Sequence, residues 1–365
     1  MAESQPNQHM LRASTCIALL QNQVDGAHAH LHQLCTIEEK FAASQLDAHQ
    51  KVSYELAFCV AELEASKVLL NYAEKLSAQD KLSVEMSLAF CAENLRTVWQ
   101  RLLAHTAEAG LSNAVLLELM GSEPLASFLA EQGKVNNFAK IGAALLDRGS
   151  VHLPSGLSEE KDRIRDAFAR FAQEIVMPHA EHIHRFDTDI PDEIIDGAAR
   201  MGCFGSCIPE HFGGLMPDTH RDSITMLVVT EELSRGSLGA AGSLITRPEI
   251  AARALLHGGT EDQKSTWLPQ LAAGEKLAAI AITEPDYGSN VAGLALKASK
   301  TIGGWLLNGA KTWCTFAGKA DVVVAIARTD PDRSKGHRGL SLFLVEKPRF
   351  PGHEFDHESE MGGGA

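Results

Sequence analysis

The string AITEPDYGSN at 281–290 places polar groups directly after an apolar stretch of the 365-residue sequence. Its apolar residues predict a strand that ends at Thr283 and turns through Glu-Pro before it reaches Gly288. A strand end offers backbone N–H and C=O groups, here with the Thr283 hydroxyl, and a glycine lets a ligand approach the chain closely. Taken alone, the Thr-Glu-Pro sequence is also typical of a simple turn.

A second string, KTWCTFAG at 311–318, contains a large flat side chain and a hydroxyl two residues apart. If this segment is a strand, Trp313 and Thr315 project to the same side of it. The indole of Trp313 could then stack on a ring while Thr315 forms a hydrogen bond. The two strings together predict a site for a planar, hydrogen-bonding heterocycle. The alternative is that Trp313 belongs to the core and Thr315 to the surface of a strand.

Histidines and cysteines form the other clusters that could do chemistry. They are His28, His30 and His32, then His179, His182 and His184, and the pair Cys203 and Cys207. The Cys pair has no second Cys/His pair at the spacing of a zinc site. The seven cysteines are odd in number and mostly far apart, which argues against a disulfide framework. We therefore expect reduced, buried thiols, solvated helix histidines and no metal site.

The elements that position these groups begin with a helical region. Residues 11–147 contain no proline except Pro124 and are rich in Ala, Leu, Glu, Gln and Lys, which favour helices. Within 54–75, apolar side chains recur at helical spacing, namely at Leu56, Val60, Leu63 and Leu70. We predict an N-terminal helical bundle at 1–147, followed by a linker at 148–157 that combines Gly, Ser and Pro.

A second helical unit is expected at 158–275. Ser158 is a good N-cap, and two glutamates follow it in the first turn, where the helix dipole favours negative charge. Four apolar residues then fall on one face of the predicted helix: Ile164, Phe168, Phe171 and Ile175.

Strands dominate the last region, 276–365. Asn308-Gly309 stands between 305–307 and 310–313 and predicts a hairpin, because both residues tolerate the positive φ of a type I′ turn. The runs at 321–327 and 340–345 predict two buried strands.

Charge and hydropathy exclude some partners. Asp and Glu number 47 against 33 Lys and Arg, for a net charge of -14, and no local basic patch stands out, so nucleic acid is not an expected partner. No run reaches the roughly 20 apolar residues of a membrane helix, and the start MAESQPNQHM does not resemble a signal peptide. We expect a cytoplasmic chain that does not enter a membrane.

Four strings match one known family in order and spacing. They are GTEDQKSTWLPQLAAGEKLAAIAITEPDYGSN (259–290), LNGAKTWCT (307–315), ADVVVAIART (320–329) and GLSLFLVEK (339–347). The chain resembles the acyl-CoA dehydrogenase family over roughly 155–365. We therefore expect an α+β multidomain protein in which the N-terminal helical bundle predicted above (1–147) and the linker are followed by two domains that the resemblance implies. These are the family's N-terminal helical domain (158–275) and an incomplete, antiparallel β-barrel-like middle domain (276–365).

The resemblance also implies FAD as cofactor and assigns residues to it. The backbone of Ile282 and the hydroxyl of Thr283 would meet the pyrimidine side of the flavin. Trp313 would pack against the ring system, and Thr315 would hydrogen-bond near N5. The absence of a G-x-G-x-x-G motif is no objection, because this family does not bind its dinucleotide through that turn.

Substrate contacts follow from the same resemblance. Ser289, beside Gly288, would contact the CoA part of a thioester. The sequence departs from the family at Asn290, where an Asp is usual, and at Ile280, where an aromatic residue is usual. The details of contacts in this turn therefore rest on fewer matching residues.

The implied reaction is the α,β-dehydrogenation of an acyl-CoA to the trans-enoyl-CoA, with flavin taking the hydride. The family's carboxylate base lies in a third, helical domain that would begin beyond Ala365, so we expect this chain alone to lack the base and we assign no catalytic residue. The resemblance further implies a homo-oligomer that passes electrons to an electron-transferring flavoprotein.

Two features reach beyond the shared body of the family. The segment at 49–75 resembles a helix of the family's C-terminal domain, although any amphipathic Ala/Leu/Glu helix would look similar. An N-terminal extension of this length is similar to that of a family member whose substrate has an acyl group with a second carboxylate. Binding of this carboxylate requires a buried cation or several hydrogen-bond donors. Arg247, in GSLITRPEI, is the candidate, against the alternative of a surface arginine at a helix start.

Other functions remain open at this point. The architecture could serve an acyl-CoA oxidase or a nitroalkane-type flavin enzyme, or a non-catalytic helical scaffold that keeps the family's shape.

Overall fold

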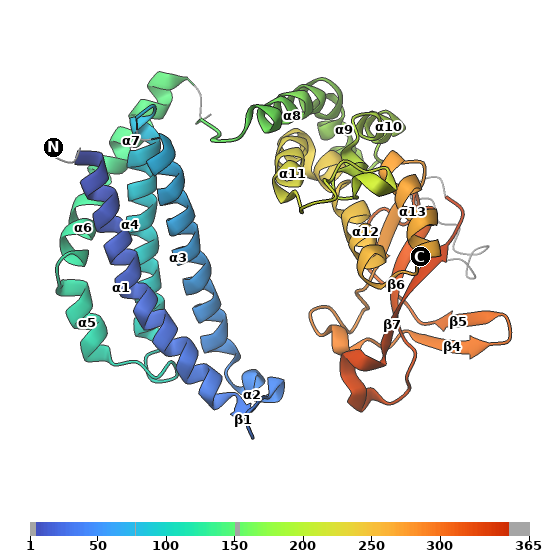
Figure 1. Cartoon of the computed structure of the whole chain (residues 1–365), viewed down its shortest axis with the longest axis horizontal. Coiled ribbons are helices and arrows are strands. Elements are labelled where there is room, and N and C mark those ends of the chain that lie inside the picture. The colour runs from blue at the N-terminus through green and yellow to red at the C-terminus, as the bar shows by residue number, and fades with distance from the viewer. Residues whose placement is uncertain (1–4, 77, 150–153, 350–365) are drawn as a thin grey trace. The chain divides into compact units, whose positions relative to one another are not determined.

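A computed structural model of the chain describes residues 5–76, 78–149 and 154–349 (Figure 1). Contacts within the chain divide it into two compact units, Met1–Gly156 and Leu157–Ala365. The predicted linker at 148–157 includes residues 150–153, which lie outside the described residues.

The first unit is built almost entirely of helices. These are α1 (Gln5–Leu34), α2 (Ala43–Ala48), α3 (Gln50–Leu76), α4 (Lys81–Ala104), α5 (Asn113–Gly121), α6 (Leu125–Gln132) and α7 (Val135–Arg148), with the two-residue strands β1 (Thr36–Ile37) and β2 (Lys40–Phe41) between α1 and α2. The three long helices α1, α3 and α4 pack side by side (Figure 1). The helical character predicted for this region is confirmed.

The apolar face predicted for 54–75 is correct except at one position. Leu56, Leu63 and Leu70 are buried in the bundle core, but Val60 is 42% exposed. Cys59, one residue earlier, is buried instead. The residues 56, 59, 63 and 70 keep the i, i+3, i+4 spacing of one helix face, and Val60 lies just outside it.

The second unit begins with helices around a separate core. They are α8 (Glu159–Phe171), α9 (Met177–Phe186), α10 (Asp192–Arg200), α11 (Ser223–Ser237), α12 (Thr246–Gly258) and α13 (Glu261–Ala273). The side chain of Ser158 caps α8 by accepting a hydrogen bond from Lys161 N, as predicted. Phe168 and Phe171 are buried, and Ile164 and Ile175 pack against the same core, so the predicted face is confirmed.

A five-stranded sheet follows the helices. Its strands are β3 (Ala278–Ala281), β4 (Lys297–Thr301), β5 (Gly304–Asn308), β6 (Val322–Arg328) and β7 (Leu340–Glu346), so the strands predicted at 321–327 and 340–345 are confirmed. β6 pairs with β7 in antiparallel register and with β3 in parallel register. β4 meets the end of β6 at Lys297 and Arg328 and forms a hairpin with β5.

The sheet differs from the predicted antiparallel barrel. Because β3 and β6 are parallel, the sheet is mixed, and over residues 278–346 it stays open rather than closed on itself. A parallel pair needs a crossover connection, since the chain must return to the same end of the sheet. Here the crossover contains the β4–β5 hairpin and the segment after it, which positions the site described below.

The hairpin predicted at Asn308-Gly309 is wrong. The turn lies at Ile302-Gly303, where Thr301 pairs with Gly304, and Asn308 is the last residue of β5. Residues 310–314 form no strand, because Thr312 N–H donates to the carbonyl of Thr283 instead of to β5. Gly309 has a φ of 143°, a backbone conformation that favours glycine, and it lies where the chain leaves the sheet after β5.

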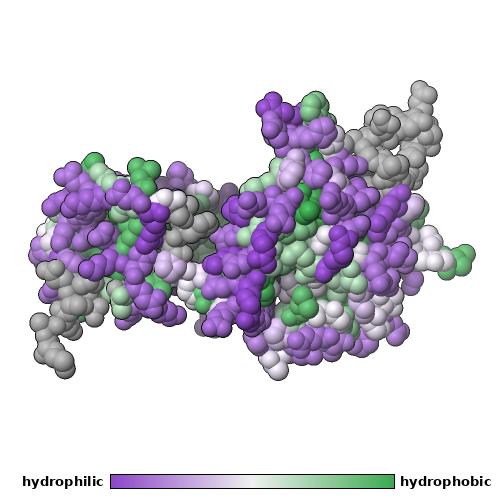
Figure 2. Space-filling model, turned by 90° about the horizontal axis from the view of Figure 1, so that it is seen from above, coloured by the Kyte–Doolittle hydropathy of each residue, from purple (hydrophilic) through white to green (hydrophobic). Residues whose placement is uncertain are grey.

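The surfaces and thiols are ordinary for globular units. The face seen in Figure 2 is mainly hydrophilic, with scattered apolar side chains. Within 5–76, 78–149 and 154–349, no helix combines the length and apolar character needed to cross a membrane.

All seven cysteines are free, and all but Cys314 are buried. Burial raises the pKa of Cys203 to about 12, so this thiol stays protonated at neutral pH.

Candidate flavin site

A loop between β5 and β6, residues 311–320, carries the second predicted string; we call it the site loop. At one end Thr312 N–H donates to the carbonyl of Thr283, 3.0 Å away, just after β3. Beyond its other end Asp321 N–H donates to the carbonyl of Leu277, 2.8 Å away, just before β3. The site loop therefore runs back along the length of β3, from its end to its start.

A cleft of about 840 Å³ opens along the site loop. Residues 311–319 line one side. The other lining residues come from α9 and the segment after it, including His184, Asp187 and Ile190, and from Ser237, Gly239 and Ala240, where α11 continues into a π-helical turn. Pockets that bind cofactors and other small ligands have volumes of about 300–1,000 Å³, so the cleft has the size of a ligand site.

Trp313 projects from the site loop and is 86% exposed. Its φ of 58° lies in the left-handed region, which costs a residue with a side chain about 1–2 kcal/mol. The alternative that Trp313 belongs to the core is wrong. Strained, exposed aromatic residues are found where a ligand completes the contacts, so this outlier supports a functional interpretation.

Phe316 shows the contrasting use of the same backbone region. Its φ is 73°, but its side chain packs against the core that contains Phe204 and Leu244. Phe316 therefore fixes the middle of the site loop to the protein. Three residues earlier, Trp313 stays free to meet a ligand in the cleft.

Thr315 also lines the cleft, but on a turn rather than a strand. Its side chain is exposed, and its N–H donates to the carbonyl of Trp313, 2.9 Å away. The predicted reason for the pairing of Trp313 with Thr315, strand alternation, is therefore wrong. The two side chains nevertheless reach the same cleft because the turn closes between them.

Ile282 and Thr283 lie beside the site loop and are half-buried. The carbonyl of Thr283 binds Thr312 N–H, and the carbonyl of Ile282 accepts a hydrogen bond from Lys311 Nζ at 2.8 Å. Neither residue is among those that line the cleft. The structure thus brings all four predicted flavin contacts to adjoining backbone, with Trp313 and Thr315 facing the open space.

A buried ion pair joins the two strings, and sequence reasoning missed it. Lys311 Nζ lies 2.9 Å from Glu284 Oε1, and both side chains are 5% exposed. The Glu284 carboxylate also accepts hydrogen bonds from Ala295 N–H and Leu296 N–H, at 2.7 and 2.9 Å. Burial would raise the pKa of Glu284, but Lys311 and the two N–H groups outweigh it and hold the pKa below its ordinary value. Glu284 lies in the string 281–290 and Lys311 in the string 311–318. Their positions in these two strings were the signal in the sequence that could have identified the pair.

The turn predicted to contact CoA lies beside this ion pair. Glu284 and Tyr287 exchange backbone hydrogen bonds of 2.9 and 3.1 Å, which form the turn. Gly288 and Ser289 are exposed and do not line the cleft. The structure therefore does not place the predicted CoA contacts among the residues that line the cleft.

Arg328 supports the backbone that follows this turn. Its buried guanidinium donates to the carbonyls of Leu294, Ala292 and Gly336, at 2.9, 2.7 and 3.3 Å. These carbonyls belong to two different loops, 291–296 and 333–339. One side chain therefore holds both loops against the end of β6.

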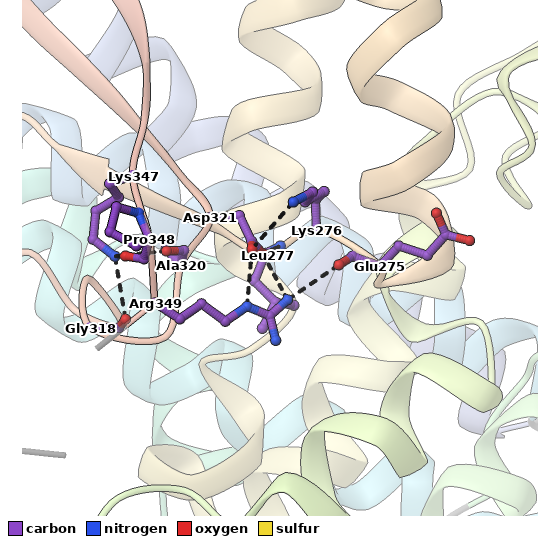
Figure 3. Close-up of polar contacts among 9 residues, drawn as sticks. All are labelled: Glu275, Lys276, Leu277, Gly318, Ala320, Asp321, Lys347, Pro348 and Arg349. Atoms are coloured by element: carbon purple, nitrogen blue, oxygen red, sulfur yellow. Dashed lines mark hydrogen bonds and ion pairs between the residues drawn. The ribbon is translucent and has the colours of Figure 1, made fainter. Parts of the chain in front are cut away.

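Polar contacts also hold the far end of the site loop (Figure 3). Lys347 Nζ donates to the carbonyls of Gly318, Ala320 and Pro348, at 3.3, 2.7 and 2.7 Å. Below it, both oxygens of Asp321 accept hydrogen bonds from Arg349, at 3.0 and 2.7 Å.

Asp321 ties this end to β3 as well, because Leu277 N–H donates to its Oδ2 at 2.8 Å. Burial would raise the pKa of Asp321, but Arg349 and Leu277 N–H outweigh it and lower the pKa.

Two protein-family models match the second unit. The model of the acyl-CoA dehydrogenase N-terminal domain matches residues 158–275, and that of the acyl-CoA dehydrogenase middle domain matches residues 279–363. Together they account for more than half of the chain. The chain belongs to the acyl-CoA dehydrogenase family.

Individual members of the family differ in how much of the chain they match. A (2S)-methylsuccinyl-CoA dehydrogenase of Cereibacter sphaeroides is 35% identical over 351 residues, which are 94% of this chain and 62% of the relative. A glutaryl-CoA dehydrogenase of Desulfococcus multivorans is 33% identical over 206 residues, 56% of this chain and 52% of the relative. The chain thus spans between one half and two thirds of these relatives.

A solved structure of a glutaryl-coenzyme A dehydrogenase in complex with glutaryl-CoA is also similar. It is 32% identical, with a TM-score of 0.48, and the match covers 53% of this chain and 48% of that chain.

Two predictions stay untested within the family frame. Arg247 lies in the first turn of α12, but its side chain lies outside the described residues. The assigned roles of the flavin and CoA residues remain predictions. Across the described ranges, no group of three or more His, Cys, Asp or Glu residues is arranged to hold a metal ion.

Proposed function

We propose that this chain is the flavin-binding part of an acyl-CoA dehydrogenase with FAD as its cofactor. The observation that carries the proposal is Trp313, an 86% exposed indole held at positive φ in a cleft of about 840 Å³. Family membership gives that cleft its ligand class, since the family uses FAD. When bound, FAD accepts the hydride that leaves the β carbon of the acyl group.

The residues present fit a flavin. Trp313 would supply a flat apolar face for the ring system, and the exposed hydroxyl of Thr315 would donate a hydrogen bond near N5. The segment of Ile282 and Thr283 would bind the pyrimidine edge. The proton removed from the α carbon needs a carboxylate base, and we propose none among the residues of this chain.

We further propose (2S)-methylsuccinyl-CoA as substrate and mesaconyl-CoA as product. The support is that the match to (2S)-methylsuccinyl-CoA dehydrogenase extends over 94% of this chain, including the N-terminal bundle, whereas the match to glutaryl-CoA dehydrogenase covers 56%. Arg247 is the proposed partner of the second carboxylate, and Gly288 and Ser289 are the proposed CoA contacts. Electron-transferring flavoprotein as electron acceptor and a homo-oligomeric state complete the proposal.

Titration of the purified chain with FAD tests the cofactor. We expect flavin fluorescence to be quenched on binding, because an indole stacked on the ring quenches it. Trp313→Ala should weaken FAD binding by about tenfold or more, and Trp313→Phe by less, since a stacked aromatic pair contributes about 0.5–1.5 kcal/mol beyond area burial.

Trp305→Ala is the matched control, because Trp305 is a half-exposed tryptophan on β5, away from the cleft. Equal FAD affinity in all three variants would contradict the proposed site. No FAD binding by the unsubstituted chain would contradict the cofactor assignment for this chain.

Binding of mesaconyl-CoA to the FAD-loaded chain tests the substrate. We expect it to perturb the flavin spectrum at lower concentration than crotonyl-CoA, which lacks the second carboxylate. Arg247→Met should remove this preference, and Arg253→Met, on the same helix α12, should keep it. A preference that survives Arg247→Met would rule out that arginine as the carboxylate partner.

A further inference from the structure

The site loop is attached to the protein by a cation at each end. Lys311, the first residue of the loop, donates to Ile282 O and to Glu284. Lys347, just after β7, donates to the carbonyls of Gly318 and Ala320 near the loop's last residue. The loop between these anchors contains Trp313 and Thr315, the two predicted flavin contacts that line the cleft.

The first anchor is almost fully removed from solvent. Lys311 and Glu284 are each 5% exposed, and Glu284 is fixed in turn by Ala295 N–H and Leu296 N–H. A buried carboxylate with three donors has one well-defined position, and so does the ammonium that it binds. The position of Lys311 therefore determines where the chain enters the site loop, two residues before Trp313.

The second anchor uses carbonyls instead of a carboxylate (Figure 3). The Lys347 ammonium has three donors, which are used by Gly318 O, Ala320 O and its neighbour Pro348 O. Hydrogen bonds from a charged donor are stronger than neutral ones, and these close the loop onto the end of β7. The adjoining ion pair between Arg349 and Asp321 holds Asp321, the residue directly after the site loop, in place.

The loop between the anchors needs such constraint. Both Trp313 and Phe316 have φ values in the left-handed region, at 58° and 73°. Strained residues keep their conformation only where the surroundings determine it. Beyond Thr312, whose N–H donates to the carbonyl of Thr283, the described backbone bonds of residues 313–320 are short-range, for example Thr315 N–H to Trp313 O and Ala317 N–H to Cys314 O.

We propose that Lys311 and Lys347 are positioning residues that hold the site loop from its two ends and thereby place Trp313 and Thr315 for the flavin. The proposal rests on the proposed function for its ligand, but the loop geometry that it concerns exists without one. Neither lysine is assigned contact with FAD or substrate. Both act through the backbone of the loop.

Hydrogen exchange of the full chain without FAD tests the anchors directly. In Lys311→Met and in Lys347→Met, amides of 311–320 should exchange about tenfold faster or more, because each loses charge-assisted bonds, while β6 and β7 keep their protection. Lys347→Arg keeps the charge and the donors and should restore slow exchange. The double variant Lys311→Met with Glu284→Gln leaves no uncompensated buried charge, so it keeps the test valid if Lys311→Met alone does not fold.

Lys161→Met is the matched control, because Lys161 forms a half-buried ion pair with Asp222 at the start of α11, outside the cleft. It should lower thermal stability and leave exchange of 311–320 and FAD binding unchanged. In the FAD titration, Lys311→Met and Lys347→Met should each weaken binding by about tenfold and reduce flavin quenching.

The outcomes separate this inference from the proposed function. If the unsubstituted chain binds no FAD, the proposed function fails, and the exchange measurement still decides whether the lysines hold the loop. If FAD binds but neither lysine variant changes loop exchange or FAD affinity beyond the Lys161→Met control, the positioning role is overturned and the proposed function stands.

Discussion

The helical bundle of the first unit and the sheet-containing second unit obtain their stability in different ways. In the bundle, one continuous core of buried apolar residues reaches from Met10 on α1 to Leu129 on α6. In the second unit, three smaller clusters occupy separate places: among the helices, between the helices and β3 with β6, and under the β4–β5 hairpin. The site loop joins only the first of these, through Phe316. Apart from Phe316, this functional loop thus lies outside the apolar cores, and charged anchors hold its two ends.

Two tryptophans illustrate the difference. In the bundle, Trp99 packs against the core and its indole N–H donates to the carbonyl of Leu116, 2.8 Å away. In the second unit, Trp313 is 86% exposed on strained backbone. The bundle uses its aromatic side chain to hold its own helices together, whereas the site loop presents one to the solvent.

Phe128→Ala has the largest expected effect and tests whether the two units are stabilised separately. Phe128 is 0% exposed in the bundle core, and removal of a buried Phe side chain costs about 3–5 kcal/mol. We expect calorimetry to show a lower melting temperature for one transition only, that of the bundle. Phe41→Ala, at a 56% exposed position in the same unit, is the control. If both transitions shift together, the two units do not unfold independently.

Acid should distinguish the units through different carboxylates. The pKa of Asp222 is lowered to about 2. Burial alone would raise this pKa, but the hydrogen bonds from Lys161 and Thr225 outweigh the effect of burial. A carboxyl with a folded pKa below its unfolded value stabilises the fold above the unfolded pKa, and this contribution is lost as pH falls through the folded pKa. The second unit should therefore lose stability between about pH 4 and pH 2.

Asp222→Asn should flatten this acid dependence in the second unit's transition and leave that of the bundle unchanged. Asp80 offers the matched substitution in the bundle, because hydrogen bonds from Arg148 lower its pKa. Asp80→Asn should act on the other transition. Melting temperatures measured from pH 7 down to about pH 2 check both, and an Asp222→Asn profile identical to the unsubstituted chain would contradict the assignment.

The smallest expected effect concerns a helix cap in the second unit. Thr260 forms a capping box with Gln263 at the start of α13, which packs against the core next to β3. Thr260→Ala should lower the stability of this unit by about 1 kcal/mol. Thr266→Ala, at an exposed position inside the same helix, should not destabilise it. A cap effect on the bundle transition would again show coupled units.

Periodicity and capping were sufficient to predict the helices and two strands. The apolar face of α8 and its Ser158 cap are local signals, and β6 and β7 are continuous apolar runs. The hairpin prediction was wrong because Asn308-Gly309 is compatible both with a hairpin turn and with the exit of the chain from the sheet. The choice depends on Thr283, which is 29 residues from its partner Thr312 and leaves no local trace.

The candidate site shows the same limit. Residue types identified Trp313 and Thr315, but strand alternation was the wrong reason for their proximity. The pairing of Lys311 with Glu284 is also long-range, and a lysine in a polar string is most often solvated. Only the crossover between the parallel strands β3 and β6 brings these groups together.

Arg328 has a consequence for how this part of the protein can vary. Because one planar guanidinium satisfies carbonyls from 291–296 and from 333–339, the lengths of these two loops are linked. An insertion or a grafted sequence in either loop would move its carbonyls away from a donor that cannot follow, since the other loop fixes it. The two loops are therefore expected to tolerate redesign as a pair and not singly.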